Sequence, residues 1–257
     1  RDSAMEMGNV ATHLYVELDC PALNIERLNA ALCRMIERHD MLRAVVGSDG
    51  TQRILPTVPP YRIMLNDASR ASLEAAERAA LEARDVLSHQ VLKADRWPLF
   101  EVRATLLPTE RVRLHVSLDL LILDAWIIFR GFKEWCQLYE HPETKPPKFE
   151  ISFRDYVLAE QGLQHSQAYQ RAHAYWMGRV ETLPAAPELP LRSDLSARKS
   201  PRFSRRDMCL EKARWEKLRA SARAKGLTPS GLLLACYSEV LARWSAAPHF
   251  TLNVTVS

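Results

Sequence analysis

The chain has 257 residues, of which 47% are hydrophobic and 26% charged, and its formal net charge is +4. This length allows one large domain or two modest lobes, and the small, dispersed charge does not favour a nucleic-acid partner. No apolar stretch predicts a membrane span or a signal peptide, and the five widely separated cysteines predict reduced thiols in a cytoplasmic protein. Because the sequence does not begin with Met, we expect it to be part of a longer chain.

Strands and helices follow one another in the first half of the chain. Residues 13–19 alternate apolar and polar side chains, as a half-buried strand does. A helix begins after the N-cap residue Asn24, and two short strands surround the turn at 48–50. Residues 72–92 predict a further helix. Its expected apolar face consists of Leu73, Ala76, Ala80, Ala83 and Leu87.

A hairpin and two long helices complete the predicted first lobe. The hairpin covers residues 100–118 and turns at 108–110, and the helices cover 125–139 and 152–178. The sequence therefore predicts an α+β lobe over residues 1–183, with helices packed on a mostly antiparallel sheet.

A proline-rich and basic linker follows over residues 184–206, where four prolines between 184 and 201 prevent a helix. After it we expect a helix that ends at Gly226, a helix with Thr228 as N-cap, and a strand from residue 249 onward. These elements are too few for an independent lobe, so residues 207–257 predict the beginning of an incomplete C-terminal lobe.

Two aspartates stand in the apolar run "HVSLDLLILDAWIIF", residues 115–129. A buried carboxylate is costly unless it is paired or hydrogen-bonded. Asp124 lies where a helix begins, which favours a helix-cap interpretation. Asp119 lies at the end of a strand and has no such explanation, so it is a candidate functional group.

The segment "DLLILDAW" resembles the DxxxxDxxS signature of heterocyclization domains of nonribosomal peptide synthetases. These domains are relatives of condensation domains, whose corresponding motif is HHxxxDG. Aligning the shared aspartate on Asp124 places Asp119 at the first His and Leu120 at the second, to which the family assigns condensation chemistry. Leu120 cannot transfer a proton, so ordinary condensation chemistry is not expected. The final Ser of the signature falls on Ile127, which departs from the pattern.

Other segments also resemble this family, in the family's order and over nearly the whole chain. They include "RHDMLRAVVGSDGTQRIL", "SHQVLKADRWPLFEVRA" and "GLTPSGLLLACYSEVLARWSAAPHFTLNVT". The resemblance implies two lobes, each similar to chloramphenicol acetyltransferase, with a tunnel between them.

The resemblance also implies an activity and its partners. Upstream and downstream peptidyl carrier proteins would deliver substrates on phosphopantetheine arms, beside an adenylation domain of the same synthetase. The domain would join a carrier-bound acyl group to Cys, Ser or Thr and then cyclodehydrate the product to a thiazoline or oxazoline, as in siderophore or peptide natural product biosynthesis. No cofactor or metal bound by the domain itself, no nucleic acid and no membrane are expected.

The candidate site residues are few. Asp119 and Asp124 are motif acids with either a catalytic or a structural role, and Arg43 is a candidate structural partner. His115 shares the polar face of its strand with Asp119; it is a candidate base, although a structural histidine is the favoured interpretation.

Two alternatives remain beside the enzyme hypothesis. A degenerate condensation-like domain would dock carrier proteins without cyclizing, and Ile127 favours it. A stand-alone acyltransferase would use His115 as base, but Leu120 occupies the position where that chemistry needs a histidine. The basic residues of 192–206 predict either a surface for an acidic carrier or a solvated loop.

Overall fold

The computed structural model describes residues 12–108, 110–190, 206 and 208–254. Contacts within the chain group the described residues from 12 to 161 into one compact unit and those from Gly162 onward into a second. Most of the predicted linker, including the basic residues at 192–205, lies outside the described residues. The predicted boundaries of the two lobes therefore stay predictions.

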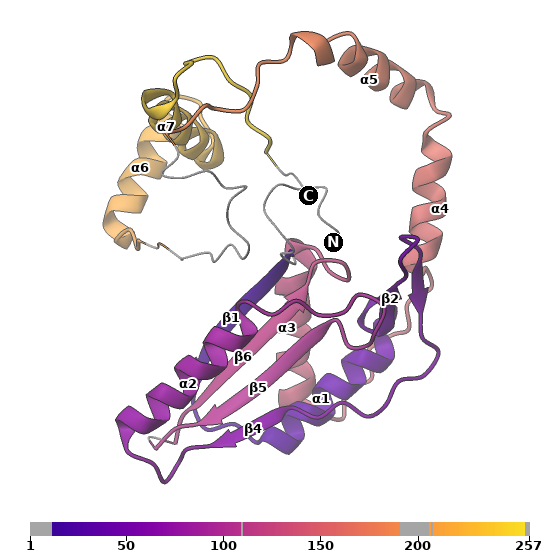
Figure 1. Cartoon of the computed structure of the whole chain (residues 1–257), viewed down its shortest axis with the longest axis vertical. Coiled ribbons are helices and arrows are strands. Elements are labelled where there is room, and N and C mark those ends of the chain that lie inside the picture. Colours follow the sequence, from indigo (N-terminus) through magenta and orange to yellow (C-terminus); the bar gives the residue numbers. More distant parts are fainter. Residues whose placement is uncertain (1–11, 109, 191–205, 207, 255–257) are drawn as a thin grey trace. The chain divides into compact units, whose positions relative to one another are not determined.

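A four-stranded sheet with the order β1–β6–β5–β4 forms the centre of the first unit (Figure 1). Its strands are β1 (His13–Cys20), β4 (Met64–Asp67), β5 (Phe100–Leu106) and β6 (Val112–Asp119). β1 and β5 pair antiparallel with β6, whereas β4 runs parallel to β5. β4 was not predicted, because all four of its residues are exposed and it lacks an apolar alternation.

A separate antiparallel pair consists of β2 (Ala44–Val46) and β3 (Gln52–Ile54), which confirms the two short strands predicted around the turn. Gly50 adopts a φ of 78° in that turn, a conformation that glycine reaches without strain. A short 3-10 helix, η1 (Asp40–Arg43), leads into β2.

The strand register places apolar residues on one face of the central sheet and polar residues on the other. On the apolar face, Val116 of β6 pairs with Val16 on one side and Val102 on the other. Helices α1 (Ile25–Arg38) and α3 (Ala125–Glu140) contribute Leu28, Met35 and Trp135, among others, to the same buried cluster. The hydrophobic core of the first unit therefore lies between this face and these two helices (Figure 1).

The polar face is covered by α2 (Leu73–Leu87), which contacts β5 and β6. Ala76, Ala80 and Leu87 are buried there, as predicted. Leu73 was expected on this face but is 64% exposed, because it lies at the start of the helix. The helix also ends at Leu87 instead of residue 92; the following loop bonds to β2 through Val46 N and the carbonyl of Ala94, 2.7 Å apart.

The single helix expected over 152–178 is two helices, α4 (Phe153–Leu163) and α5 (Gln167–Met177). The Ser166 hydroxyl accepts a hydrogen bond from Tyr169 N, so it caps a new helix instead of continuing the first.

The described part of the second unit contains α5, a short 3-10 helix η2 (Val180–Thr182), α6 (Lys212–Ala224) and α7 (Pro229–Trp244). Gly226, with a φ of 68°, follows α6, and Thr228 caps α7, as predicted. Residues 249–254 do not form the expected strand; Thr251 N bonds to Ala185 O, but no ladder follows. Among the described residues, no helix is both long and apolar enough to cross a membrane.

Candidate functional site

The two motif aspartates stand at the two ends of the short connection between β6 and α3. Asp119 is the last residue of β6, and Asp124 immediately precedes α3. Backbone bonds hold the start of this connection: Asp119 N donates to Leu99 O, and Leu120 N donates to Thr12 O, each at 3.0 Å. The start of the connection is thus hydrogen-bonded to the residues that precede β5 and β1, the two strands next to β6 in the sheet.

Asp119 is 2% exposed. Its Oδ1 accepts a hydrogen bond from Leu121 N at 3.0 Å, and its carbonyl accepts one from Ile122 N at 3.2 Å. An aspartate that bonds the backbone two residues ahead stabilises a tight turn. Part of this buried carboxylate is therefore used to turn the chain out of the sheet.

Asp124 confirms the predicted helix cap. Its Oδ1 accepts a hydrogen bond from Ile127 N at 2.7 Å, and the side chain is otherwise exposed. A negative charge at a helix N-terminus is favourable, because the first N–H groups of a helix lack partners within it. Each motif acid thus accepts a hydrogen bond from a backbone N–H group, one at each end of the connection.

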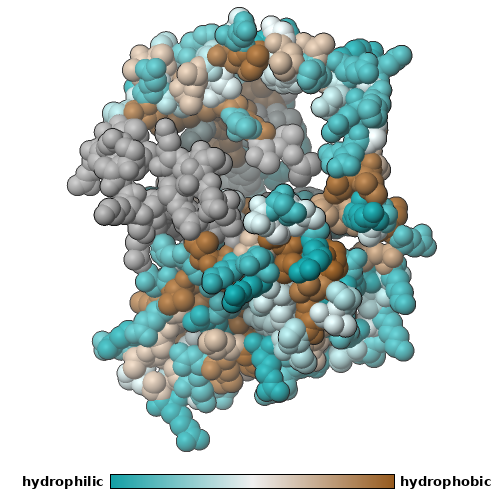
Figure 2. Space-filling view, turned by 45° about the vertical axis from the view of Figure 1, so that its right-hand side comes forward, coloured by the Kyte–Doolittle hydropathy of each residue, from teal (hydrophilic) through white to brown (hydrophobic). Residues whose placement is uncertain are grey.

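Large apolar side chains lie exposed next to these acids. Trp126 is 63%, Ile127 45% and Phe129 74% exposed on the first turns of α3, and Leu120 is 38% exposed just before them. Figure 2 shows hydrophobic residues among hydrophilic ones on the face of the molecule that it draws. Ile127 therefore does not fill the core, and an exposed carboxylate adjoins an apolar surface that could contact an uncharged substrate.

Arg43 is not paired with Asp124. Its guanidinium donates to Asp40 Oδ1 at 2.7 Å and to the carbonyls of Ile36 and Leu55 at 2.5 and 3.1 Å. These contacts hold η1 against the end of α1 and against the residue that follows β3. The predicted role of Arg43 as partner of Asp124 is corrected accordingly: its donors are occupied around the turn after α1.

His115 lies on the polar face of β6 with Ser117 and Asp119, as predicted, and is fully buried. Its Nδ1 is 2.7 Å from the Tyr15 hydroxyl. Burial is the main cause that lowers the pKa of the His115 imidazole. Tyr15 was not singled out from the sequence, although its place in the alternating segment 13–19 puts it on this face.

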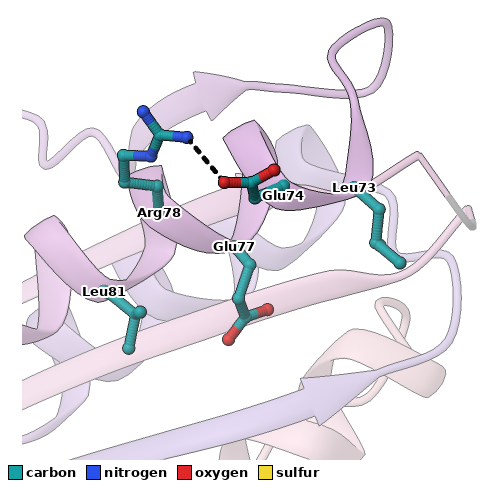
Figure 3. A pocket seen from close by; sticks show the side chains of 5 residues that line it. All are labelled: Leu73, Glu74, Glu77, Arg78 and Leu81. Carbon is teal, nitrogen blue, oxygen red and sulfur yellow. Dashed lines mark hydrogen bonds and ion pairs between the residues drawn. The ribbon is translucent and has the colours of Figure 1, made fainter.

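The depression on the outer side of α2 has a different character (Figure 3). It is lined by Leu73, Glu74, Glu77, Arg78 and Leu81. Glu74 and Arg78 form an exposed ion pair at 3.2 Å, and Glu77 pairs with Arg113 of β6 at 2.6 Å. These charges neutralise one another, so no reactive group is directed into the depression. Among the described residues, no group of three or more His, Cys, Asp or Glu side chains is placed to hold a metal ion.

Comparison with known families and proteins gives consistent matches. The family model described as "Condensation domain" matches residues 9–257. Pyochelin synthetase PchF of Pseudomonas aeruginosa is 38% identical over 258 residues, which cover 100% of this chain and 14% of PchF. Phenyloxazoline synthase MbtB of Mycobacterium tuberculosis is 36% identical over 259 residues, which cover 99% of this chain and 18% of MbtB. The chain thus spans less than a fifth of either relative.

Solved structures match over most of the chain. The cyclization-docking bidomain of EpoB, a nonribosomal peptide synthetase from Sorangium cellulosum, matches with a TM-score of 0.86 and 38% identity, over 96% of this chain and 50% of that one. The nonribosomal peptide synthetase FmoA3 matches with a TM-score of 0.79 and 32% identity, over 95% and 25%. These similarities confirm the predicted α+β fold class.

Proposed function

The chain belongs to the condensation-domain family, and we propose that it is part of a heterocyclization domain of a nonribosomal peptide synthetase. In this proposal the amine of a carrier-bound Cys, Ser or Thr attacks an upstream acyl thioester and releases the pantetheine thiol. The side-chain thiol or hydroxyl then adds to the new amide carbonyl, and loss of water gives a thiazoline or oxazoline.

The observation that carries the proposal is the motif itself. Asp119 and Asp124 occupy the two ends of the β6–α3 connection, and Leu120 stands where an ordinary condensation domain has a histidine. The names of two relatives, a phenyloxazoline synthase and a cyclization bidomain, support the same assignment.

The residues of this chain act mainly by positioning. Tethering both substrates supplies much of the first step, since it makes the attack on the thioester effectively intramolecular. Asp119 turns the chain out of β6 and Asp124 fixes the start of α3, which presents Trp126 and Phe129. Dehydration needs an acid to release the hydroxyl and a base to take the amide proton, and the exposed Asp124 carboxylate is the candidate for one of these roles in this chain.

The proposed partners follow from the same chemistry. An upstream and a downstream peptidyl carrier protein bring the substrates on phosphopantetheine arms, and an adenylation domain of the same synthetase loads the nucleophilic amino acid. The domain binds no cofactor of its own and works in the cytoplasm, and its product is a heterocyclic peptide or siderophore.

The test supplies the synthetase that contains this chain with both loaded carrier proteins and analyses the products by mass spectrometry. Expected is a product that lacks one water relative to the linear amide. A carrier loaded with Ala serves as control, because its side chain cannot cyclize and should give the amide alone. A linear amide with Cys, Ser and Thr, and no ring, would refute cyclization.

A second candidate function is carrier docking without cyclization. It is favoured by Ile127, whose exposed side chain has no hydroxyl at the last position of the signature. The same assay distinguishes it, because a docking module would bind both carriers without forming the ring.

A further inference from the structure

A continuous chain of polar contacts runs from β6 through β1 to α2. The Tyr15 hydroxyl is 2.7 Å from His115 Nδ1 and donates to Glu17 Oε2 at 3.0 Å. Glu17 in turn accepts two hydrogen bonds of 2.6 Å from Arg84 of α2, one on each carboxylate oxygen. Three elements that lie far apart in the sequence are thus joined across the polar face of the sheet (Figure 1).

The direction of each hydrogen bond in this chain is fixed by chemistry. Burial by itself raises the pKa of Glu17, but the hydrogen bonds from Arg84 and from the Tyr15 hydroxyl together hold it below its usual value. The carboxylate is therefore ionised and can only accept. Burial and the charge of Glu17 raise the pKa of Tyr15 well above its usual value, so the phenol keeps its one proton and donates it to Glu17. Its oxygen must then accept from His115, which places a proton on Nδ1.

The other nitrogen of the ring has a different environment. His115 is 0% exposed, and its Nε2 has no hydrogen-bond partner among the described residues. Ser117, the next residue on the same face, is equally buried, and its hydroxyl oxygen also lacks a partner among them. Two polar atoms without a partner among the described residues therefore belong to the same face of β6, on the stretch that leads to Asp119.

The charges that face His115 come from every element packed around it. They are Glu17 and Asp19 on β1, Glu101 and Arg103 on β5, Arg113 and Asp119 on its own strand, and Glu77 and Arg84 on α2. Burial is the main cause of the lowered pKa of His115; Glu17 opposes it, and Arg113, Arg84 and Arg103 reinforce it. A second proton on the ring is thus disfavoured.

We infer that His115 is a positioning residue of the site, held as a neutral imidazole with its proton on Nδ1 by the chain Tyr15–Glu17–Arg84. The hydrogen bond to Tyr15 joins the pairs Tyr15–Ser117 and Glu17–His115 diagonally, two and four positions before the pair His13–Asp119. It thereby holds β6 on β1 next to the strand end from which Asp119 turns. The inference rests on the proposed function, because it concerns the position of a motif acid of that site.

Two substitutions of His115 distinguish the roles of its two ring nitrogens. His115→Asn places an amide N–H close to the position of Nδ1 and keeps the donor to Tyr15, whereas His115→Gln extends past that position toward Nε2. If the Nδ1–H bond fixes β6, the Asn variant retains the melting temperature and product formation better than the Gln variant. Tyr15→Phe removes the acceptor with a smaller change in shape, and Tyr156→Phe on exposed α4 is the matched control.

The direct test is a long-range proton–nitrogen correlation spectrum of this chain near pH 7, labelled at histidine nitrogens and assigned with the His115→Asn variant. Expected is a signal for His115 with a protonated Nδ1 and an unprotonated Nε2, which Tyr15→Phe changes and Tyr156→Phe does not. An Nε2–H tautomer, or an imidazolium at this pH, would overturn the inference. This test needs no turnover, so its failure is distinct from a failure of the proposed function.

The pH profile of ring formation by the full synthetase gives the functional readout. Expected is a rate that falls toward acid pH in the natural protein as His115 takes up a second proton, and an acid limb that shifts to lower pH in His115→Asn. Acid limbs that coincide in the two proteins, or equal loss of rate in His115→Asn and His115→Gln, would show that the histidine only fills space.

Discussion

Substitutions of Asp119 test whether its carboxylate stabilises the turn or takes part in the reaction. In Asp119→Ala the hydrogen bond from Leu121 N, 3.0 Å long, loses its acceptor in a half-buried loop. An N–H group left unsatisfied in this way costs about 1–3 kcal/mol. At roughly 2–4 °C per kcal/mol for a protein of this size, the melting temperature should fall by about 2–12 °C.

Asp119→Asn keeps a side-chain carbonyl oxygen in the same place. It should therefore cost less than Asp119→Ala, because the turn retains its acceptor. In the parent synthetase we expect ring formation to be abolished by Asp119→Ala and retained by Asp119→Asn. Asp95→Ala, at an exposed position, is the control and should change stability by no more than about 0.5 kcal/mol.

Thermal melts followed by circular dichroism and the mass-spectrometric ring assay measure the two effects separately. Equal melting temperatures for the Asn and Ala variants would show that the accepted hydrogen bond is not what stabilises this turn. An Asn variant with a natural melting temperature and no ring product would show that the negative charge itself is required, and would make Asp119 catalytic.

Three further predictions concern the cap, the motif departure and acid stability. Asp124→Ala should lower the free energy of unfolding by about 0.5–2 kcal/mol and abolish ring formation, whereas Asp124→Ser should keep the cap. Chemical denaturation measures the stability of the two variants, and the mass-spectrometric assay measures ring formation. Ile127→Ser should leave ring formation undiminished and cost only about 1 kcal/mol, since the side chain is 45% exposed; a loss of several kcal/mol would place Ile127 in a packed core. The pKa of His115 is lowered in the folded state, so the unfolded chain takes up this proton first as the pH falls. The free energy of unfolding should therefore decrease as the pH drops below about 6.5 toward the pKa of His115 in the folded protein. The pKa of Glu17 is also lowered, so its protonation should add a further loss of stability below about pH 4.5. Urea titrations at a series of pH values test this, and the loss below pH 6.5 should be smaller in His115→Asn.

Local sequence patterns were sufficient for most elements of the fold. The alternation over 13–19 and 112–118 predicted two strands with one apolar and one polar face, and the register confirms both. Asn24, Asp124 and Thr228 were recognised as helix caps, because a cap bonds to a backbone group only three residues away. The motif position of Asp119 and Asp124 was likewise visible in the sequence.

Features that depend on distant residues were decided by the tertiary structure alone. β4 has no apolar pattern and exists because β5 offers it a partner, and α2 ends early because the loop after it bonds to β2. Arg43 finds acceptors around its own turn that no spacing rule indicates. The contact of Tyr15 with His115 joins residues 100 positions apart, so it follows from the register of β1 on β6 and not from either segment. Local propensity acts within a few residues, whereas register and packing bring together groups that the chain itself keeps apart.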